Sequence, residues 1–275
     1  MLVHFSKMHG LGNDFVVIDA INQTIDLNPE TIRQLADRHY GIGFDQMLLV
    51  RPAQAGADFR YVIYNADGSE VSQCGNGARC FALFVKQKGL SDKSSIRVET
   101  GAGELILNIN AQNQITVDMG APIFEPANIP LDSAQQQLTY TADAAGTQLE
   151  FSAISMGNPH AVIQVDNVQQ TAVDVLGAAM ESHVLFPERV NIGFSEITSR
   201  NSLKLRVYER GAGETLACGS GACAAAVAGI QLGKLSSPVT VHLAGGNLSI
   251  AWQGEGEPVM MSGPASFVFD GMITL

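Results

Sequence analysis

Two cysteines of the chain lie in near-copies of one short segment. Residues 70–78 read EVSQCGNGA, and residues 214–222 read ETLACGSGA. Each copy is followed by an apolar, Ala-rich run that is typical of a helix. A cysteine at the start of a helix is favoured as an accessible thiolate, because the helix N-terminus lowers the pKa of its thiol. Cys74 and Cys218 therefore indicate a symmetric site with one sulfur on each side of a substrate.

Two opposed thiols suit the inversion of a stereocentre by proton transfer. A thiolate on one face of the carbon removes a proton, and a thiol on the other face delivers one. An unperturbed thiol has a pKa of about 8.5, so modest tuning is enough for this work near neutral pH. Two glycine-rich helix starts would bind a carboxylate and stabilise the charge that develops as the α-proton leaves. No part of the sequence marks a cofactor that could take up this charge, and none is expected.

The duplication continues outside the cysteine motifs. Residues 12–18 (GNDFVVI) resemble residues 157–163 (GNPHAVI), and residues 42–46 correspond to residues 188–191. All these matches occur in the same order, at an offset of 144 or 145 residues. A unit of this length is too long for a solenoid repeat. We therefore expect two similar lobes that face each other.

Composition limits the classes of partner. A net charge of −11 argues against nucleic acid and against an anionic membrane surface, since both attract basic proteins. No apolar run reaches the length of a membrane span, and the first ten residues lack the apolar core of a signal peptide. We expect a cytoplasmic protein with reduced cysteines. Because Cys80 and Cys223 do not form C-x-x-C pairs, no metal is expected, and both are interpreted as buried helix residues.

The elements that position these residues follow from hydrophobic patterning. Helices are predicted over residues 29–38, 76–88, 173–181 and 220–232. Strands are predicted over residues 3–7, 15–19, 47–50, 59–64, 96–99, 105–109, 115–118, 149–154, 161–165, 190–196, 203–208, 239–243, 248–252, 259–262 and 266–275. Residues 119–137, with three prolines, are the best candidate for a linker. If the last strand returns to the first lobe, one domain covers residues 1–119 plus 264–275 and the other covers residues 120–263.

Several motifs resemble those of the diaminopimelate epimerase family. They are residues 65–79 (NADGSEVSQCGNGAR), 208–222 (YERGAGETLACGSGA), 10–15 (GLGNDF), 41–46 (GIGFDQ) and 156–160 (MGNPH). The match runs from about Lys7 to the C-terminus. The resemblance implies a cofactor-independent epimerase that interconverts LL- and meso-diaminopimelate, on the route to lysine and peptidoglycan. It also implies an α/β (α+β) fold of two pseudosymmetric domains, each a β-rich barrel-like lobe around a central helix, with the active site in the cleft between them.

The resemblance also assigns roles to individual residues. It implies that Cys74 and Cys218 are the base and the acid, and that His160 and Glu209 influence the protonation of the thiols. The reacting carboxylate would be bound at the two helix starts, by Gly75, Asn76, Gly219 and Ser220. The family often has Thr where this chain has Ser220, and the backbone N–H is the same. The rest of the substrate would contact Asn13, Gln46, Asn65, Asn158, Asn191, Glu209 and Arg210.

Other functions fit parts of the same pattern. A related cofactor-free racemase could use both cysteines on proline, hydroxyproline or another amino acid, although Arg210 and the asparagines favour a substrate with a distal polar group. A redox or ligand-binding module could pair the two cysteines in a disulfide. Nucleotide binding is disfavoured, because the Gly-rich loops lack the Lys and Ser/Thr of a phosphate-binding loop. Arg79 is either a site residue or a helix-surface cation. A small molecule is the expected partner, and a homodimer is compatible with the sequence.

Overall fold

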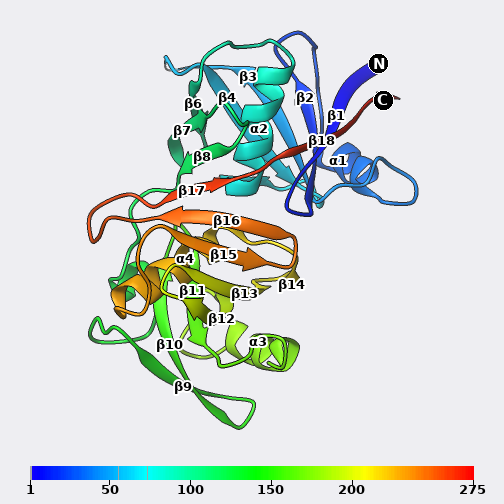
Figure 1. The fold of residues 1–275 in the computed structure, drawn as a ribbon. Helices are drawn as coiled ribbons and strands as arrows, with labels where there is room; N and C mark the ends of the chain where they lie inside the picture. The colour runs from blue at the N-terminus through cyan, green and yellow to red at the C-terminus, as the bar shows by residue number, and fades with distance from the viewer. Residues whose placement is uncertain (1, 55, 73) are drawn as a thin grey trace. The chain divides into compact units, whose positions relative to one another are not determined.

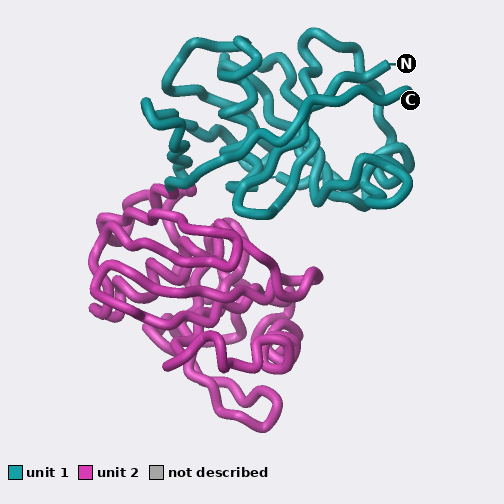
Figure 2. Tube along the Cα trace, turned by 45° about the vertical axis from the view of Figure 1, so that its right-hand side comes forward, with its two compact units in different colours: residues 1–118, 262–275 teal, residues 119–261 magenta. Residues whose placement is uncertain are grey.

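The chain forms two compact units in a computed structural model that describes residues 2–54, 56–72 and 74–275. Gln73, within the first cysteine motif, lies outside these residues. Unit 1 comprises residues 1–118 and 262–275, and unit 2 comprises residues 119–261 (Figure 2). The two divisions fall one and two residues before the domain boundaries expected from the sequence. The mixed α/β class expected from the sequence is confirmed.

Unit 1 is built on one strongly curved sheet. Its main strands are β1 (Leu2–Gly10), β2 (Asn13–Asp19), β3 (Gln46–Pro52), β4 (Phe59–Asn65), β6 (Ser95–Thr100), β7 (Gly103–Ile109), β8 (Ile115–Asp118) and the returning β18 (Ser266–Thr274). They are ordered β18-β1-β2-β3-β4-β6-β7-β8, with β2–β3 and β4–β6 parallel and the other pairs antiparallel. The short β5 (Glu70–Val71) pairs with β4. The C-terminal strand β18 pairs with β1 and so lies in unit 1.

Helix α2 (Gly75–Gln87) lies among these strands and contacts β1, β2, β3, β7, β8 and β18 (Figure 1). Every residue from Asn76 to Val85 is buried, and a helix buried on all sides must be apolar nearly all round. The sheet continues around the helix. Thr116 Oγ1 in β8 lies 2.7 Å from the hydroxyl of Ser262 in β17 (Met260–Gly263), and β17 leads into β18. Helix α1 (Pro29–Ala36) covers the outer face, with Asn28 as its N-cap.

Unit 2 repeats this plan. Its strands are β9 (Tyr140–Ala144), β10 (Thr147–Ser155), β11 (Pro159–Gln164), β12 (Asn191–Ser199), β13 (Ser202–Glu209), β15 (Val239–Leu243) and β16 (Gly246–Ala251), in that order across the sheet. The parallel pairs are β11–β12 and β13–β15, the counterparts of β2–β3 and β4–β6. Helix α4 (Gly219–Gln231) packs against β10 to β13, β15 and β16, and α3 (Val173–Glu181) covers the outer face. The short β14 (Gly213–Thr215) pairs with β13.

The internal repeat extends to the register of the strands. Phe15 pairs with Gln46 in unit 1, and their counterparts His160 and Asn191 pair in unit 2. Both central helices end in the same way, at Gly89 and Gly233, which each have a φ of +66°. This left-handed conformation terminates a helix and is most easily adopted by glycine. One architecture is therefore used twice, with different side chains at matched positions.

The segment 119–137 is not a free linker. It contains a short 3-10 helix, η1 (Pro126–Asn128), and the side chains of Ile129 and Leu131 are buried in the core of unit 2. The sequence analysis missed this packing because prolines obscure the apolar periodicity. It also missed strands β5, β9 and β14, of which β5 and β14 are too short to show alternation.

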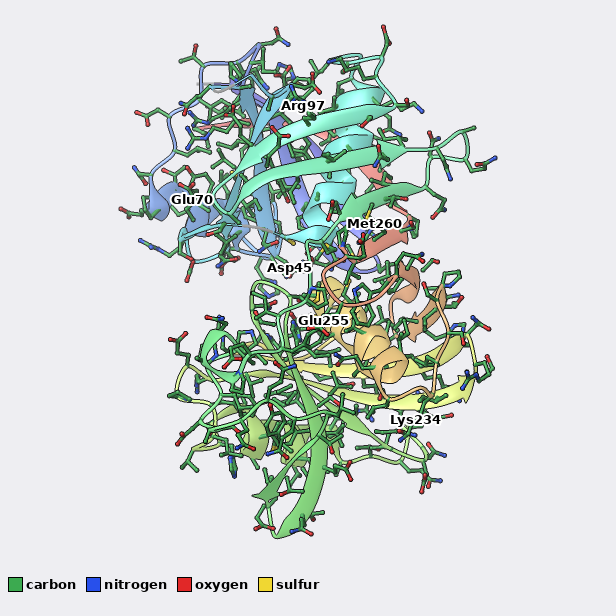
Figure 3. The ribbon with its side chains drawn as sticks, turned by 90° about the vertical axis from the view of Figure 1, so that its left-hand side faces the viewer. Asp45, Glu70, Arg97, Lys234, Glu255 and Met260 are labelled. Atoms are coloured by element: carbon green, nitrogen blue, oxygen red, sulfur yellow. The ribbon has the colours of Figure 1, made fainter. Side chains whose placement is uncertain are left out.

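The surface of the strands carries charged side chains, as Arg97 on β6 illustrates (Figure 3). Its guanidinium lies 3.9 Å from Glu104 on β7. None of the helices in the described ranges is long and apolar enough to span a membrane.

Gly77 should be essential to the packing of α2. A Cβ atom there would lie 2.2 Å from the Tyr61 hydroxyl oxygen, whereas at Gly221, the counterpart in α4, the nearest atom would be 3.2 Å away. We expect Gly77→Ala to destabilise the protein by about 1–3 kcal/mol, as overpacking does, and Gly221→Ala to cost less. Thermal denaturation of the two variants measures the difference. An equal loss of Tm in both would contradict this account of the packing.

Candidate active site

Cys74 is the N-cap of helix α2. Its backbone is extended (φ −149°, ψ 112°), and its sulfur accepts the N–H of Gly77 at 3.4 Å. Its carbonyl accepts the N–H of Ala78 at 2.8 Å and the hydroxyl of Tyr61 at 3.3 Å. Burial raises the pKa of Tyr61 well above its ordinary value, so this hydroxyl stays protonated as a donor. The Cys74 thiol is therefore fixed at the positive, N-terminal end of a buried helix. Cys74 itself is partly exposed.

Asn76, in the first turn of α2, joins the helix start to strand β2. Its side-chain amide donates to Asn13 Oδ1 at 3.3 Å, and Asn13 in turn donates to Asp45 Oδ2 at 2.9 Å. These two bonds fix the orientation of the Asn13 amide. Two of the expected substrate-binding residues, Asn76 and Asn13, are thus in contact, and Asn76 lies two positions after Cys74 in the chain.

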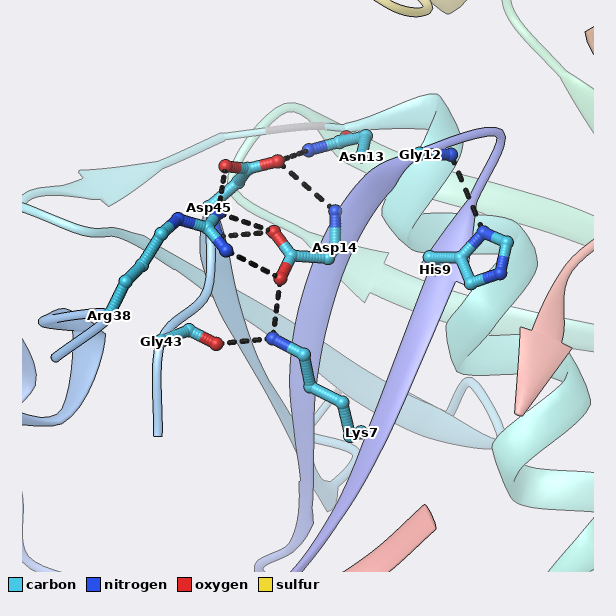
Figure 4. A network of polar contacts seen from close by, with 8 residues as sticks. All are labelled: Lys7, His9, Gly12, Asn13, Asp14, Arg38, Gly43 and Asp45. Carbon is cyan, nitrogen blue, oxygen red and sulfur yellow. Dashed lines mark hydrogen bonds and ion pairs between the residues drawn. The ribbon is translucent and has the colours of Figure 1, made fainter. Parts of the chain in front are cut away.

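Asp45 belongs to a network of charges that the sequence analysis did not identify (Figure 4). The guanidinium of Arg38 bridges Asp14 and Asp45, at 2.8 Å and 2.7 Å, and Lys7 pairs with the other oxygen of Asp14. Burial alone would raise the pKa of Asp14, but its bonds to Arg38 and Lys7 outweigh this effect and lower the pKa to about 2. Asp45 is thereby held where it accepts from Asn13 and from the backbone N–H of Asp14.

Gln46 and Asn65 lie at the same edge of the sheet as Asn13. Gln46 pairs with Phe15 on one side and with Asn65 on the other, and its amide donates to Asn65 Oδ1 at 2.9 Å. The oxygen Oε1 of Gln46 is buried and has no hydrogen-bond partner among the described residues. An unpaired buried acceptor is costly in a folded protein, and such atoms are often found where a ligand supplies the missing donor.

Cys218 is the N-cap of α4, as Cys74 is of α2, but its surroundings differ. Its exposed fraction is 4%, and its sulfur lies 3.6 Å from the Ser220 hydroxyl. Burial raises the pKa of the Cys218 thiol well above its ordinary value, and the carboxylate of Glu209 raises it further through charge and a hydrogen bond. The Gly221 amide and Ser220 oppose this shift only in part. The expectation of an accessible thiolate with a lowered pKa is therefore wrong for Cys218, because burial and Glu209 outweigh the helix terminus.

Glu209 is fixed at the end of β13. Its Oε1 accepts the hydroxyl of Thr215 at 2.5 Å. The counterpart of Glu209 in unit 1 is Asn65, which is neutral. The negative charge therefore belongs to the unit that contains Cys218.

His160 lies in β11 and is 1% exposed. Its Nε2 lies 3.0 Å from Asn158 Oδ1, and its Nδ1 is buried and finds no hydrogen-bond partner in the part of the chain that the structure describes. Burial lowers the pKa of His160 to about 3, and the positive charge of Arg210 contributes to the shift. His160 is therefore neutral at physiological pH.

Asn191 and Arg210 are fixed by contacts to backbone groups. Asn191 donates to the carbonyl of Pro159 at 2.9 Å and accepts the backbone N–H of Arg210 at 3.0 Å. The guanidinium of Arg210 donates to the carbonyl of Glu188 at 2.9 Å. Glu181, which the sequence analysis missed, accepts the N–H of Gly211 at 2.6 Å and so holds the loop that follows Arg210.

The expected site residues thus form two clusters, one in each unit. The cluster of unit 1 contains Cys74, Gly75, Asn76 and Asn13 at the start of α2, with Gln46 and Asn65 at the adjoining sheet edge. The cluster of unit 2 contains Cys218, Gly219, Ser220, Glu209, Asn158, His160, Asn191 and Arg210. Cys80 and Cys223 are buried inside the helices, as predicted. A hollow in unit 2 beside Gln164, Asp166 and Lys234 contains none of these residues.

Within the described ranges, no group of three or more His, Cys, Asp or Glu side chains is arranged to hold a metal ion. The arrangement offers thiols, amides, one guanidinium and two helix N-termini. These groups can bind carboxylates and transfer protons.

The comparisons with known proteins agree on the fold. The diaminopimelate epimerase family model matches residues 5–125 and 152–268. A probable proline racemase from Agrobacterium radiobacter superposes with a TM-score of 0.74 at 16% identity, covering 99% of this chain and 93% of its own. A hydroxyproline epimerase from Agrobacterium vitis gives 0.70 at 14% identity, covering 99% and 92%. A phenazine biosynthesis protein of the PhzF family from Bacillus anthracis gives 0.69 at 16% identity, covering both chains fully.

Removing the charge of Glu209 should make Cys218 more reactive. The thiolate is the nucleophile in alkylation, so a thiol with a raised pKa reacts slowly at neutral pH. In Glu209→Gln the pKa of Cys218 falls, and its alkylation by iodoacetamide accelerates. Peptide mass spectrometry measures the rate at Cys218 separately from the rate at Cys74.

Glu214→Gln is the matched control, because Glu214 pairs with Arg206 rather than with the thiol. It should leave the alkylation rate of Cys218 unchanged. Equal rates in wild type and Glu209→Gln would show that Glu209 does not control this thiol.

Proposed function

The chain belongs to the diaminopimelate epimerase family, and we propose that it interconverts LL- and meso-diaminopimelate without a cofactor. The observation that carries the proposal is the repeated helix start with a cysteine N-cap, placed in different surroundings in the two units. Both sulfurs accept a backbone N–H from the first turn of their helix, but Cys218 is also buried beside the carboxylate of Glu209. One thiol is thus suited to be a base and the other an acid.

The proposed reaction is a proton transfer through the two thiols, which act on opposite faces of one α-carbon. The Cys74 thiolate takes the α-proton, and the electron pair of the C–H bond remains on the carbon, conjugated with the carboxylate. The Cys218 thiol then gives its proton to the other face and becomes a thiolate. The reverse reaction exchanges these roles. The raised pKa of Cys218 supports its role as the acid in the resting enzyme.

The reacting carboxylate would be held by the first amides of the two central helices. Gly75 and Asn76 begin α2, and Gly219 and Ser220 begin α4. Amides at a helix N-terminus bind anions and stabilise the additional negative charge of the transition state. No electron sink besides the carboxylate is then required.

The distal amino-acid group of the substrate would bind the polar side chains that flank the thiols. A carboxylate suits Arg210, and an ammonium suits amide oxygens such as Oε1 of Gln46, which is buried and unpaired. Asn13, Asn65, Asn158, Asn191 and Glu209 complete the proposed binding set, and the neutral His160 lies among them. A substrate without the distal group would leave these groups unpaired, which is costly.

A proline or hydroxyproline racemase is the second candidate, since the fold resembles proteins with those names. Arg210 argues against it, because neither imino acid offers a second carboxylate for a guanidinium. A redox or binding module is a third candidate and predicts no turnover in the reduced protein. We further propose that the reaction belongs to lysine and peptidoglycan precursor synthesis in the cytoplasm, where both thiols would remain reduced.

The direct test is turnover of LL-diaminopimelate by the reduced protein, followed by chromatography of the derivatised stereoisomers. We expect meso-diaminopimelate to form without added cofactor, and no change in L-proline or trans-4-hydroxy-L-proline. Cys74→Ala and Cys218→Ala should each lower the rate by a hundredfold or more, roughly the contribution of a general acid or base.

Cys223→Ala is the control, because Cys223 is buried within the Ala-rich helix α4. It should retain the wild-type rate. Turnover of proline but not of diaminopimelate would favour the second candidate. Normal rates in either Cys74→Ala or Cys218→Ala would exclude the two-thiol mechanism.

The homodimer that the sequence allows also remains a proposal, supported by the exposed apolar side chains of strand β18. Phe267, Val268, Phe269 and Met272 on this strand are 41% to 64% exposed. Large apolar side chains exposed together on one strand are typical of an interface rather than of a free monomer. Lys88 and Asp270 form an ion pair beside these side chains, so this surface carries both signs of charge. Such a surface can be complementary to the same surface of a second copy of the chain.

Sedimentation velocity tests this proposal. The wild type should sediment as a dimer, and Met272→Glu should shift it to a monomer by placing a charge in the apolar interface. Val184→Glu, at a side chain that is 85% exposed in unit 2, is the matched control and should not change the mass. A monomeric wild type would contradict the homodimer.

A further inference from the structure

Arg79 is a fully buried cation beneath the start of α2. Its exposed fraction is 0%, although arginine is rarely buried completely. Its Nε donates to the carbonyl of Pro264 at 3.1 Å, and Nη2 donates to Asn76 Oδ1 at 3.0 Å. Nη1 lies 3.5 Å from the carbonyl of Gly75. The guanidinium therefore connects the first turn of α2 to the segment that leads into β18.

The architecture does not need this cation. The counterpart of Arg79 in the second repeat is Cys223, which is also buried completely. Helix α4 has the same length as α2, the same cysteine N-cap and the same enclosure by strands. A buried charge costs free energy that a neutral residue avoids, so its presence in only one repeat requires a local reason.

That reason lies in what the guanidinium contacts. Gly75 and Asn76 are the two residues that begin α2 after Cys74, and Asn76 donates to Asn13. Because the Asn76 oxygen accepts from Arg79, its amide nitrogen must point toward Asn13. The planar guanidinium of Arg79 thus fixes the carbonyl of Gly75 and the side-chain amide of Asn76. Through the Asn76 amide it also fixes the orientation of Asn13.

We propose that Arg79 is a positioning residue of the reaction, which holds the first turn of α2 in the geometry that binds the reacting carboxylate and fixes the Cys74 sulfur. This role rests on the proposed function wherever it concerns turnover. Lysine cannot replace it, because a single ammonium has no planar fork to engage the three acceptors at once.

The test compares Arg79→Lys with Arg200→Lys. Arg200 also donates to a carbonyl, that of Gly233 at the end of α4, and it is the matched control for the loss of a guanidinium. We expect Arg79→Lys to lower kcat/KM for LL-diaminopimelate about a hundredfold, because catalytic groups displaced from their productive positions lose about this much rate. Arg200→Lys should leave kcat/KM unchanged. A wild-type value in a folded Arg79→Lys protein would overturn the proposal.

A second measurement does not depend on the substrate. In Arg79→Lys, loss of the first-turn geometry should weaken the hydrogen bond from the Gly77 N–H to the Cys74 sulfur. The alkylation rate of Cys74 should then fall relative to the rate of Cys218 in the same molecule. If the wild type does not turn over diaminopimelate, the proposed function fails, and this ratio alone decides the role of Arg79. An unchanged ratio would overturn it.

Gly10→Ala is a second test variant, for use if the Arg79→Lys protein does not fold. A Cβ at position 10 would lie 3.2 Å from Arg79 Nη2 and 3.2 Å from the Asn76 carbonyl oxygen, so it displaces the guanidinium and keeps its charge. The same two readouts should change in the same direction, by a smaller factor. A folded Gly10→Ala protein in which neither readout changes would count against the proposal.

Discussion

The position of each thiol depends on a helix start that is buried inside its own unit. Cys74 and Cys218 are N-caps, so their sulfur atoms lie where four backbone N–H groups have no partner within the helix. The enclosing strands prevent the helix from shifting, and in unit 1 the contact between Gly77 and Tyr61 leaves no room for a side chain. Carboxylate binding, thiol placement and the role assigned to Arg79 all depend on this packing.

The two repeats share a backbone plan and differ in charge at the positions that matter. Arg79, Asn65 and Phe15 in unit 1 correspond to Cys223, Glu209 and His160 in unit 2. The cation lies at the Cys74 helix, and the carboxylate lies beside Cys218, where it adds to the effect of burial in raising the pKa of that thiol. An acid and a base can therefore arise from one duplicated scaffold, because the surroundings of each thiol, rather than the thiols themselves, differ.

Much of this arrangement could be predicted from the sequence because the duplication marks it. The strands and helices around Cys74 and Cys218 agree with the predicted ranges within a few residues. The Arg38–Asp14–Asp45 network could not be predicted, since it joins residues from separate elements through side-chain geometry. The raised pKa of Cys218 could not be predicted for a similar reason: a helix start implies a lowered pKa, and only tertiary packing reveals the opposing burial. The role of Arg79 does not follow from the sequence, because sequence alone does not show that strands enclose α2 on all sides.

The central claim is that two thiols, rather than one base, invert the α-carbon. The most direct test is the distribution of deuterium early in the conversion of LL-diaminopimelate in deuterium oxide, followed by proton NMR and mass spectrometry. Two thiols predict that newly formed meso-diaminopimelate carries a solvent deuterium at the inverted centre, while the remaining LL isomer carries none. A product that retains the substrate's own proton would show that a single base removes and returns it, and would contradict the account.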